Sequence, residues 1–172
     1  HAVGLLLAVM KKITFFDHAT RAGNFQARNG EYTRELQGKS LGLVGFGSIA
    51  QKVAKILGNG FGMNVVAYVR NLSIEKQKAA KLLGVELTTS LEKIFSDSDA
   101  VSLHIPLTRE TEKLVDYELL SLMKPTAVLI NTASASASEM LAATLNEQIN
   151  AILVGNTTFG KGSVQEVFTT SS

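Results

Sequence analysis

Cysteine is absent from this chain of 172 residues, which excludes disulfides, thiolate catalysis and cysteine-based zinc sites. The lack of cysteine fits a reducing compartment, and we expect the protein to be cytoplasmic. The only histidines, His1, His18 and His104, stand too far apart to suggest a metal site, so we predict none. Neither sign of charge is in large excess, because the net charge is +2 at pH 7. This balance gives no support for a nucleic-acid or anionic-membrane partner.

Long apolar runs are scarce as well. The run from Ala2 to Met10 is too short to span a bilayer. Two lysines follow this run, whereas the positive charges of a signal peptide precede its apolar segment. We predict a helix over residues 2–16 that is apolar on nearly every face and therefore buried, against a domain outside this chain or a second subunit. Residues 17–38 are polar with scattered glycines and indicate an arm or loop.

The chain is organised around residues 39–50, which have the sequence KSLGLVGFGSIA. A short apolar run of leucine and valine flanked by glycines predicts a buried strand. The following turn fits G-x-G-x-x-[G/A], in which Gly45 permits the tight turn and Gly47 lets a pyrophosphate approach the backbone. Ala50 is small enough for the next helix to pack on the strand. The free N–H groups and the helix dipole would then face the phosphates.

The context of the motif favours dinucleotide binding over a purely structural glycine turn, which is the alternative. A strand precedes the turn, and apolar residues at helical spacing follow it. The apolar face of this helix is predicted to contain Ile49, Val53, Ile56, Leu57 and Gly60, with two lysines on the other side.

Buried strands alternate with helices along the rest of the chain. Further strands are expected at residues 63–69, 85–87, 100–105, 127–130, 151–154 and 164–168. Helices are expected at 74–83, after Ser90, after Asp116 and at 137–147, with Ser73, Ser90 and Asp116 as N-caps. This alternation predicts a single α/β domain over residues 1–172, a doubly wound, Rossmann-like parallel sheet with helices on both faces and the ligand at the carboxyl ends of the strands.

Four motifs resemble, in order and spacing, the cofactor domain of D-2-hydroxyacid dehydrogenases. They are Gln37–Ile49, Phe61–Met63, Ser98–Thr108 and Met123–Ala133, and the resemblance covers residues 1–133. It implies a nicotinamide dinucleotide site in which Gly45, Gly47, Ser48 and Ile49 hold the pyrophosphate. His104, Ile105, Pro106, Thr132 and Ala133 would line the ribose and nicotinamide side. The alternative for His104 is a capped strand end.

The end of the second strand bears on the type of cofactor. NAD enzymes of this kind place an acidic residue there to bind the ribose 2′-hydroxyl. This chain has Arg70 and Asn71 instead, and a guanidinium suits a 2′-phosphate. We therefore predict NADP over NAD, the alternative being that Arg70 is a solvated surface charge.

The resemblance also implies catalytic groups that this chain does not show. Where the family carries an arginine that holds the substrate carboxylate, the sequence has Ser134. The family's later glutamate and histidine have no counterpart before Ser172, and its substrate domain has none either. Hydride transfer to or from a 2-hydroxy or 2-oxo acid needs a substrate clamp and an acid–base group. We therefore expect no dehydrogenase turnover from this chain alone.

Residues 131–168 resemble another family, the carboxy-terminal processing (tail-specific) serine peptidases, which use a Ser–Lys dyad. By motif position Ser136 would be the nucleophile, Lys161 its base, and Gln165 would orient the lysine. A lysine acts as a base only where its pKa is lowered toward neutrality. The alternative is a small-residue turn with a helix cap, followed by a solvated loop lysine.

These resemblances leave three hypotheses. The chain is a dinucleotide-binding domain, or a serine endopeptidase, or an inactive chimera of the two families joined between residues 39–133 and 134–172. The 1–38 segment also predicts a homodimer through the N-terminal helix, because related dehydrogenases pair through that region.

Overall fold

One parallel sheet runs through the computed structural model, which describes residues 1–131 and the backbone of residues 152–155. Its order is β3-β2-β1-β4-β5-β6, and all neighbouring strands are parallel. The strands are β1 (Ser40–Val44), β2 (Asn64–Tyr68), β3 (Glu86–Thr88), β4 (Ala100–Leu103), β5 (Val128–Asn131) and β6 (Ile152–Gly155). The order reverses direction between β1 and β4, which confirms the predicted doubly wound α/β fold.

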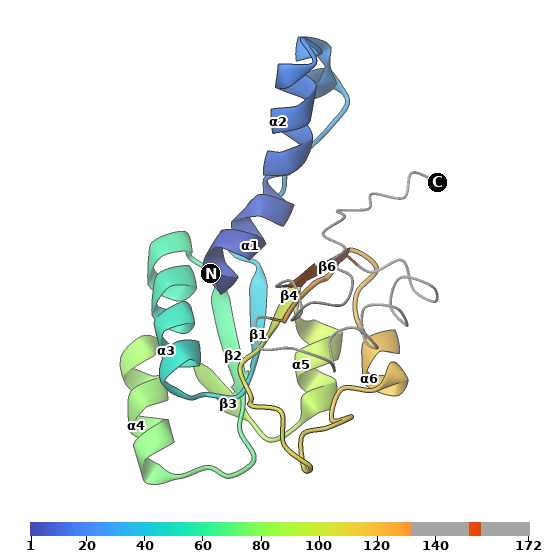
Figure 1. Ribbon diagram of the computed structural model, residues 1–172. Helices are drawn as coiled ribbons and strands as arrows, with labels where there is room; N and C mark the ends of the chain where they lie inside the picture. Colours follow the sequence, from blue (N-terminus) through green and yellow to red (C-terminus); the bar gives the residue numbers. More distant parts are fainter. Residues whose placement is uncertain (132–151, 156–172) are drawn as a thin grey trace.

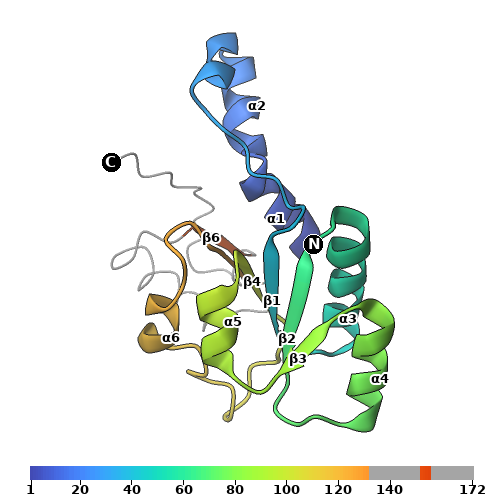
Figure 2. The same ribbon diagram turned by 180° about the vertical axis from the view of Figure 1, so that it is seen from behind.

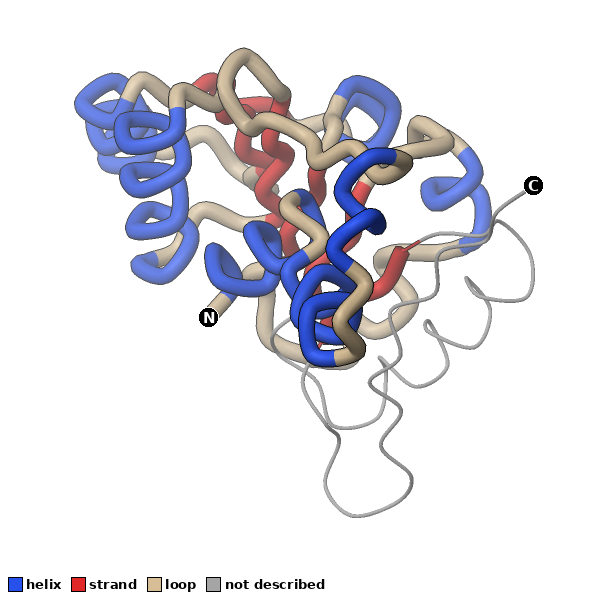
Figure 3. Tube along the Cα trace, turned by 90° about the horizontal axis from the view of Figure 1, so that it is seen from above, coloured by secondary structure: helices blue, strands red, loops and turns tan. Residues whose placement is uncertain are grey.

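Helices cover both faces of this sheet (Figures 1 and 2), and Figure 3 shows them on either side of the strands. They are α1 (Ala2–Met10), α2 (Ile13–Arg21), α3 (Ser48–Ala54), α4 (Ile74–Leu83), α5 (Leu91–Asp97) and α6 (Tyr117–Ser121), with a 3-10 helix η1 (Phe25–Asn29) and a π-helix η2 (Lys55–Gly60). In the described part of the chain, no helix has the length and apolar character to cross a membrane. The helix expected at 137–147 and the strand expected at 164–168 lie outside the described residues.

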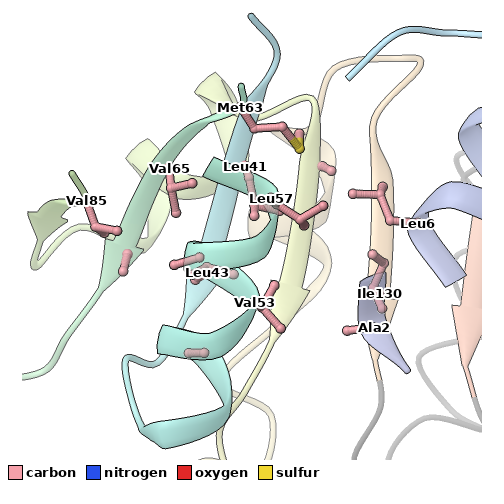
Figure 4. Close-up of a cluster of buried hydrophobic side chains, with 14 of the residues drawn as sticks. Ala2, Leu6, Leu41, Leu43, Val53, Leu57, Met63, Val65, Val85 and Ile130 are labelled. Carbon is pink, nitrogen blue, oxygen red and sulfur yellow. The ribbon is translucent and has the colours of Figure 1, made fainter. Parts of the chain in front are cut away.

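Alternation along the strands divides the core into two layers. Leu41 and Leu43 of β1 belong to the layer that packs with α1 and α3, whereas Val44 belongs to the layer formed with α5 and α6. Figure 4 shows the first layer, in which Leu57 of η2 and Leu6 of α1 join the strand residues. Successive side chains of a strand point to opposite faces, so both faces need apolar cover. Each leucine buried in this way contributes about 1.5–3 kcal/mol.

The predicted helix caps are confirmed at three helices. The side chains of Ser73, Ser90 and Asp116 accept hydrogen bonds from backbone N–H groups three residues later, at 3.3, 3.1 and 3.0 Å. Gly84 ends α4 in the left-handed conformation, with φ of 66°. These local signals therefore place α4, α5 and α6 within a residue or two of their predicted starts.

The N-terminal segment differs from the single buried helix predicted for residues 2–16. The helix breaks at Lys12, whose φ is 49°, so that α1 and α2 are separate helices. Only α1 packs on the sheet, through residues such as Leu6, whereas α2 has no buried residue and projects away from the sheet in Figure 1. Polar residues at 17–21, predicted to be loop, continue α2, and its apolar side chains Ile13 and Phe15 stay exposed.

The buried face of α3 is also different from the predicted one. Ala50, Val53 and Leu57 are buried, because they lie three and four residues apart on the face toward the sheet. Ile49 is 65% exposed, and Ile56 and Gly60 are exposed too, so placing these three on the apolar face was wrong.

Candidate functional site

The turn from β1 into α3 packs directly against the end of β4. Gly45 has φ of 99°, and its N–H donates to the carbonyl oxygen of Tyr68 at 3.1 Å. A Cβ at Gly45 would lie 2.9 Å from the carbonyl oxygen of His104 and 2.9 Å from Cγ2 of Ile105. The position therefore requires glycine for two reasons, the positive φ and the close approach of the neighbouring strand.

Open space surrounds the second glycine of the motif. A Cβ at Gly47 would meet no heavy atom within 4 Å among the described residues. Gly47 is the N-cap of α3, and no described side chain caps this helix start. The first N–H groups of a helix lack partners within the helix, so those of Ser48 and Ile49 are available to an anionic group.

A cavity of about 480 Å³ opens beside this turn, at the carboxyl ends of β1, β2 and β4. This volume is within the range of small-molecule and cofactor sites. Its lining comes from the end of β1, the end of β2, α4 and the segment after β4, here called the 105–114 segment (yellow in Figure 1). The lining residues are Gly45, Phe46, Tyr68, Val69, Arg70, Lys76, Ile105, Pro106, Thr108, Glu110, Thr111 and Leu114.

Opposite charges meet at this cavity. Nη1 of Arg70 lies 2.8 Å from Oε2 of Glu110, and the two side chains are 63% and 72% exposed. Lys76 also lines the cavity, and its ammonium group donates to the backbone oxygen of Asn71 at 3.4 Å. An ion pair this exposed contributes at most about 1 kcal/mol to stability, so a charged ligand can compete for Arg70.

The side chain of His104 lies beside the cavity rather than in its lining. Its Nε2 is 2.9 Å from the hydroxyl of Ser102, which is itself buried. Burial lowers the pKa of His104 below the ordinary value of 6.5. The imidazole is therefore mainly neutral at pH 7.

Comparison with known proteins fits this geometry. The sequence profile of the NAD-binding domain of D-isomer specific 2-hydroxyacid dehydrogenases matches residues 3–154. The chain belongs to this family. It is a domain of the NAD(P)-binding type, and its Rossmann-like sheet and glycine turn agree with this.

Three proteins illustrate what this dehydrogenase domain is similar to. Glyoxylate reductase of Thermococcus kodakarensis is 41% identical over 135 residues, which are 75% of this chain and 39% of that enzyme. D-mandelate dehydrogenase of Rhodotorula graminis has a TM-score of 0.81 at 26% identity, over 95% of this chain and 50% of its own. An acyclic imino acid reductase solved with NADPH and D-Arg has a TM-score of 0.76 at 32% identity, covering 92% and 50%. The chain thus spans half or less of these relatives.

The dehydrogenase match crosses the junction predicted after residue 133. It includes Ser136 but ends before Lys161 and Gln165, and all three lie outside the described residues. Strand β6 beyond the junction pairs with β5 in the same parallel sheet. No comparison supports a peptidase segment, so the family assignment is to the dehydrogenases alone.

The predicted cofactor residues of this dehydrogenase domain fall into four groups. Four of them line the cavity, namely Gly45, Arg70, Ile105 and Pro106. Gly47, Ser48 and Ile49 form the start of α3, and Asn71 and His104 border the cavity without lining it. Thr132 and Ala133 lie outside the described residues.

Several lining residues were missed by the sequence analysis, among them Tyr68, Lys76 and Glu110. Lys76 is one turn into α4, and Glu110 follows β4 by several residues, so neither belongs to the glycine motif. The available signal was positional. Segments that follow the strands on either side of the switch point meet over the same crevice in a doubly wound sheet.

Proposed function

We propose that the domain binds the adenosine and pyrophosphate part of a nicotinamide dinucleotide at this cavity, for an oxidoreductase acting on 2-hydroxy or 2-oxo acids. The observation that carries the proposal is the cavity itself, which lies at the carboxyl ends of β1, β2 and β4 beside the open turn at Gly47. In this arrangement Gly47, Ser48 and Ile49 receive the pyrophosphate through the start of α3, whereas Gly45, whose own N–H donates to Tyr68, shapes the turn beside it.

Arg70 and Lys76 support NADP as the preferred cofactor. Both line the cavity next to the end of β2, where an acidic residue would bind the 2′-hydroxyl of NAD. A guanidinium and an ammonium favour a 2′-phosphate, and Asn71 adjoins them. The imino acid reductase with the same fold was solved with NADPH, which is a property of that protein and agrees with the proposal.

The other end of the cofactor would extend toward the carboxyl end of β4. His104, Ile105 and Pro106 follow that strand, and Thr132 and Ala133 follow β5. We propose that these residues line the ribose and nicotinamide. Because Ser134 stands where the family carries the substrate-binding arginine, we expect these residues to bind cofactor without a clamp for the substrate carboxylate.

Titration with NADPH and with NADH, followed by nicotinamide fluorescence, tests the proposal. Saturable binding of both is expected, with NADPH tighter. Arg70→Gln should weaken NADPH by about tenfold or more and NADH by less than about threefold, since a charge-assisted hydrogen bond contributes roughly 1.5–3 kcal/mol. Lys78→Gln, an exposed lysine of α4 outside the cavity lining, is the matched control. Absence of saturable binding would refute the proposal.

We also propose a homodimer, which is supported by exposed apolar side chains among residues 13–32. Ile13 and Phe15 of α2, Phe25 of η1 and Tyr32 are all exposed in the single chain. A second copy would cover them and recover their hydrophobic free energy. Sedimentation of the parent chain should show a dimer. The variants Ile13→Asp and Phe25→Asp should shift the monomer–dimer equilibrium toward the monomer. A monomeric parent chain at all concentrations would remove this proposal.

The serine-endopeptidase alternative rests on the sequence motif of Ser136, Lys161 and Gln165 alone. An active-site serine probe decides it. Labelling that disappears in Ser136→Ala and Lys161→Ala would support a hydrolase, whereas an unlabelled parent chain would remove that function.

A further inference from the structure

The further inference concerns the ion pair at the mouth of the cavity and rests on the proposed function. We propose that Glu110 tunes the discrimination between NADP and NAD by competing with the 2′-phosphate for Arg70. The two residues are 40 positions apart in the sequence and come from different segments, yet Oε2 of Glu110 lies 2.8 Å from Nη1 of Arg70. Both line the same cavity.

The 105–114 segment holds Glu110 in place through its own hydrogen bonds. The hydroxyl of Thr111 donates to the carbonyl oxygen of Pro106 at 2.6 Å, and the N–H of Thr108 donates to that hydroxyl at 2.8 Å. The N–H of Glu112 also donates to the carbonyl oxygen of Thr108 at 2.8 Å. Glu110 is therefore carried by an ordered turn, from which its side chain reaches Arg70.

Glu110 supplies the carboxylate that the end of β2 lacks. In NAD-binding domains of this type, an acidic residue accepts a hydrogen bond from the ribose 2′-hydroxyl and disfavours a 2′-phosphate. Here the strand end carries Arg70, and the carboxylate comes from across the cavity. Arg70 thus favours the cofactor with the phosphate, while Glu110 opposes it by repulsion and by occupying the guanidinium.

The Arg70–Glu110 pair is too exposed to have a large role in the stability of the fold. Both side chains are more than half exposed, so the pair contributes little to folding and yields readily to a competing anion. Lys76 lines the same cavity and adds a second cation there. Removing the Glu110 charge therefore leaves the fold intact and leaves both cations available to the phosphate.

The test compares dissociation constants of NADPH and NADH for the 172-residue chain and its Glu110→Gln variant at one fixed ionic strength. The ratio of the NADH to the NADPH constant should rise by about threefold to tenfold in the variant, with NADPH bound more tightly. Glu112→Gln removes a nearby exposed carboxylate that does not line the cavity, and this control should keep the parent ratio.

A double variant locates the effect. If Glu110 acts through Arg70, then Glu110→Gln should change the ratio much less in an Arg70→Gln background than in the parent. An unchanged ratio in Glu110→Gln, or an equal change in Glu112→Gln, would overturn the inference while leaving the proposed function in place. A parent chain that binds neither cofactor would overturn both.

Discussion

Gly45 lies so close to the carbonyl oxygen of His104 that a Cβ at Gly45 would come within 2.9 Å of it. This approach brings the carboxyl ends of β1 and β4 together at the point where the strand order reverses direction. A crevice opens at that point in doubly wound sheets. The glycine thus serves the fold and the proposed site at once.

Gly45→Ala tests this contact. The new methyl group requires a strained backbone at φ of 99° and displaces the end of β4, so we expect a loss of about 1–3 kcal/mol in the free energy of unfolding. Gly47→Ala has ordinary φ and open space, so its stability should stay within about 1 kcal/mol of the parent while NADPH binding falls. Urea unfolding and cofactor titration measure both. Equal stability of the two variants would contradict the contact.

Gly42, within β1, should respond to crowding instead of backbone strain. A Cβ at Gly42 would lie 2.5 Å from Oγ of Ser98 and 2.7 Å from Cγ2 of Ile94, where α5 packs on the sheet. Gly42→Ala should therefore destabilise the fold by about 1–3 kcal/mol. Gly4→Ala, on an open position of α1, should stabilise it by about 0.5–1 kcal/mol because alanine is the better helix former. Thermal unfolding distinguishes the opposite signs.

Asp99 immediately precedes β4, and its side chain links the start of β1 to the segment before β5. Its carboxylate accepts from the N–H of Ser40 at 2.8 Å and from the ammonium of Lys124 at 3.2 Å. Burial by itself would raise the pKa of this carboxyl, but the hydrogen bonds and the positive charges outweigh burial and hold the pKa below its usual 3.8. The carboxylate therefore stabilises the fold above that pH, and the contribution is lost as the pH falls through the lowered pKa.

Asp99→Asn should cost about 1 kcal/mol at pH 7, because it removes the charge that Lys124 faces and keeps the shape of the side chain. The difference between the parent and the variant should shrink as the pH falls below 3.8, where the carboxyl becomes protonated in the unfolded chain and then in the fold. Urea unfolding at several pH values measures the difference. A gap that stays constant down to low pH would contradict this role.

His104, which contacts Ser102, predicts a second pH dependence of the free energy of unfolding. Burial lowers the pKa of His104, so the unfolded chain binds a proton at a higher pH than the folded chain does. The free energy of unfolding should therefore fall as the pH drops below 6.5. His104→Gln should remove this part of the slope, as measured by urea unfolding between about pH 7.5 and 5. Parallel curves for the parent and the variant would contradict the prediction.

Short stretches of sequence were enough to predict most of the sheet. The apolar runs, the glycine turn and the caps Ser73, Ser90 and Asp116 act within a few residues of chain, and the structure places strands and helices where they indicate. The motif residues Gly45 and Gly47 were predictable for the same reason, since backbone conformation and lack of a side chain are local properties.

The tertiary structure alone decided the features that depend on distant segments. It separated α2 from the core at Lys12, turned Ile49 outward, and brought Glu110 to Arg70 across the cavity. Local pattern specifies that a helix or strand forms, whereas its rotation and its neighbours follow from how all elements share one buried surface. The amino-acid sequence by itself thus determined the alternating strands and the glycine turn. Only the folded sheet decided which charged side chains line the cavity, because parallel packing brings together chain ends that the sequence keeps far apart.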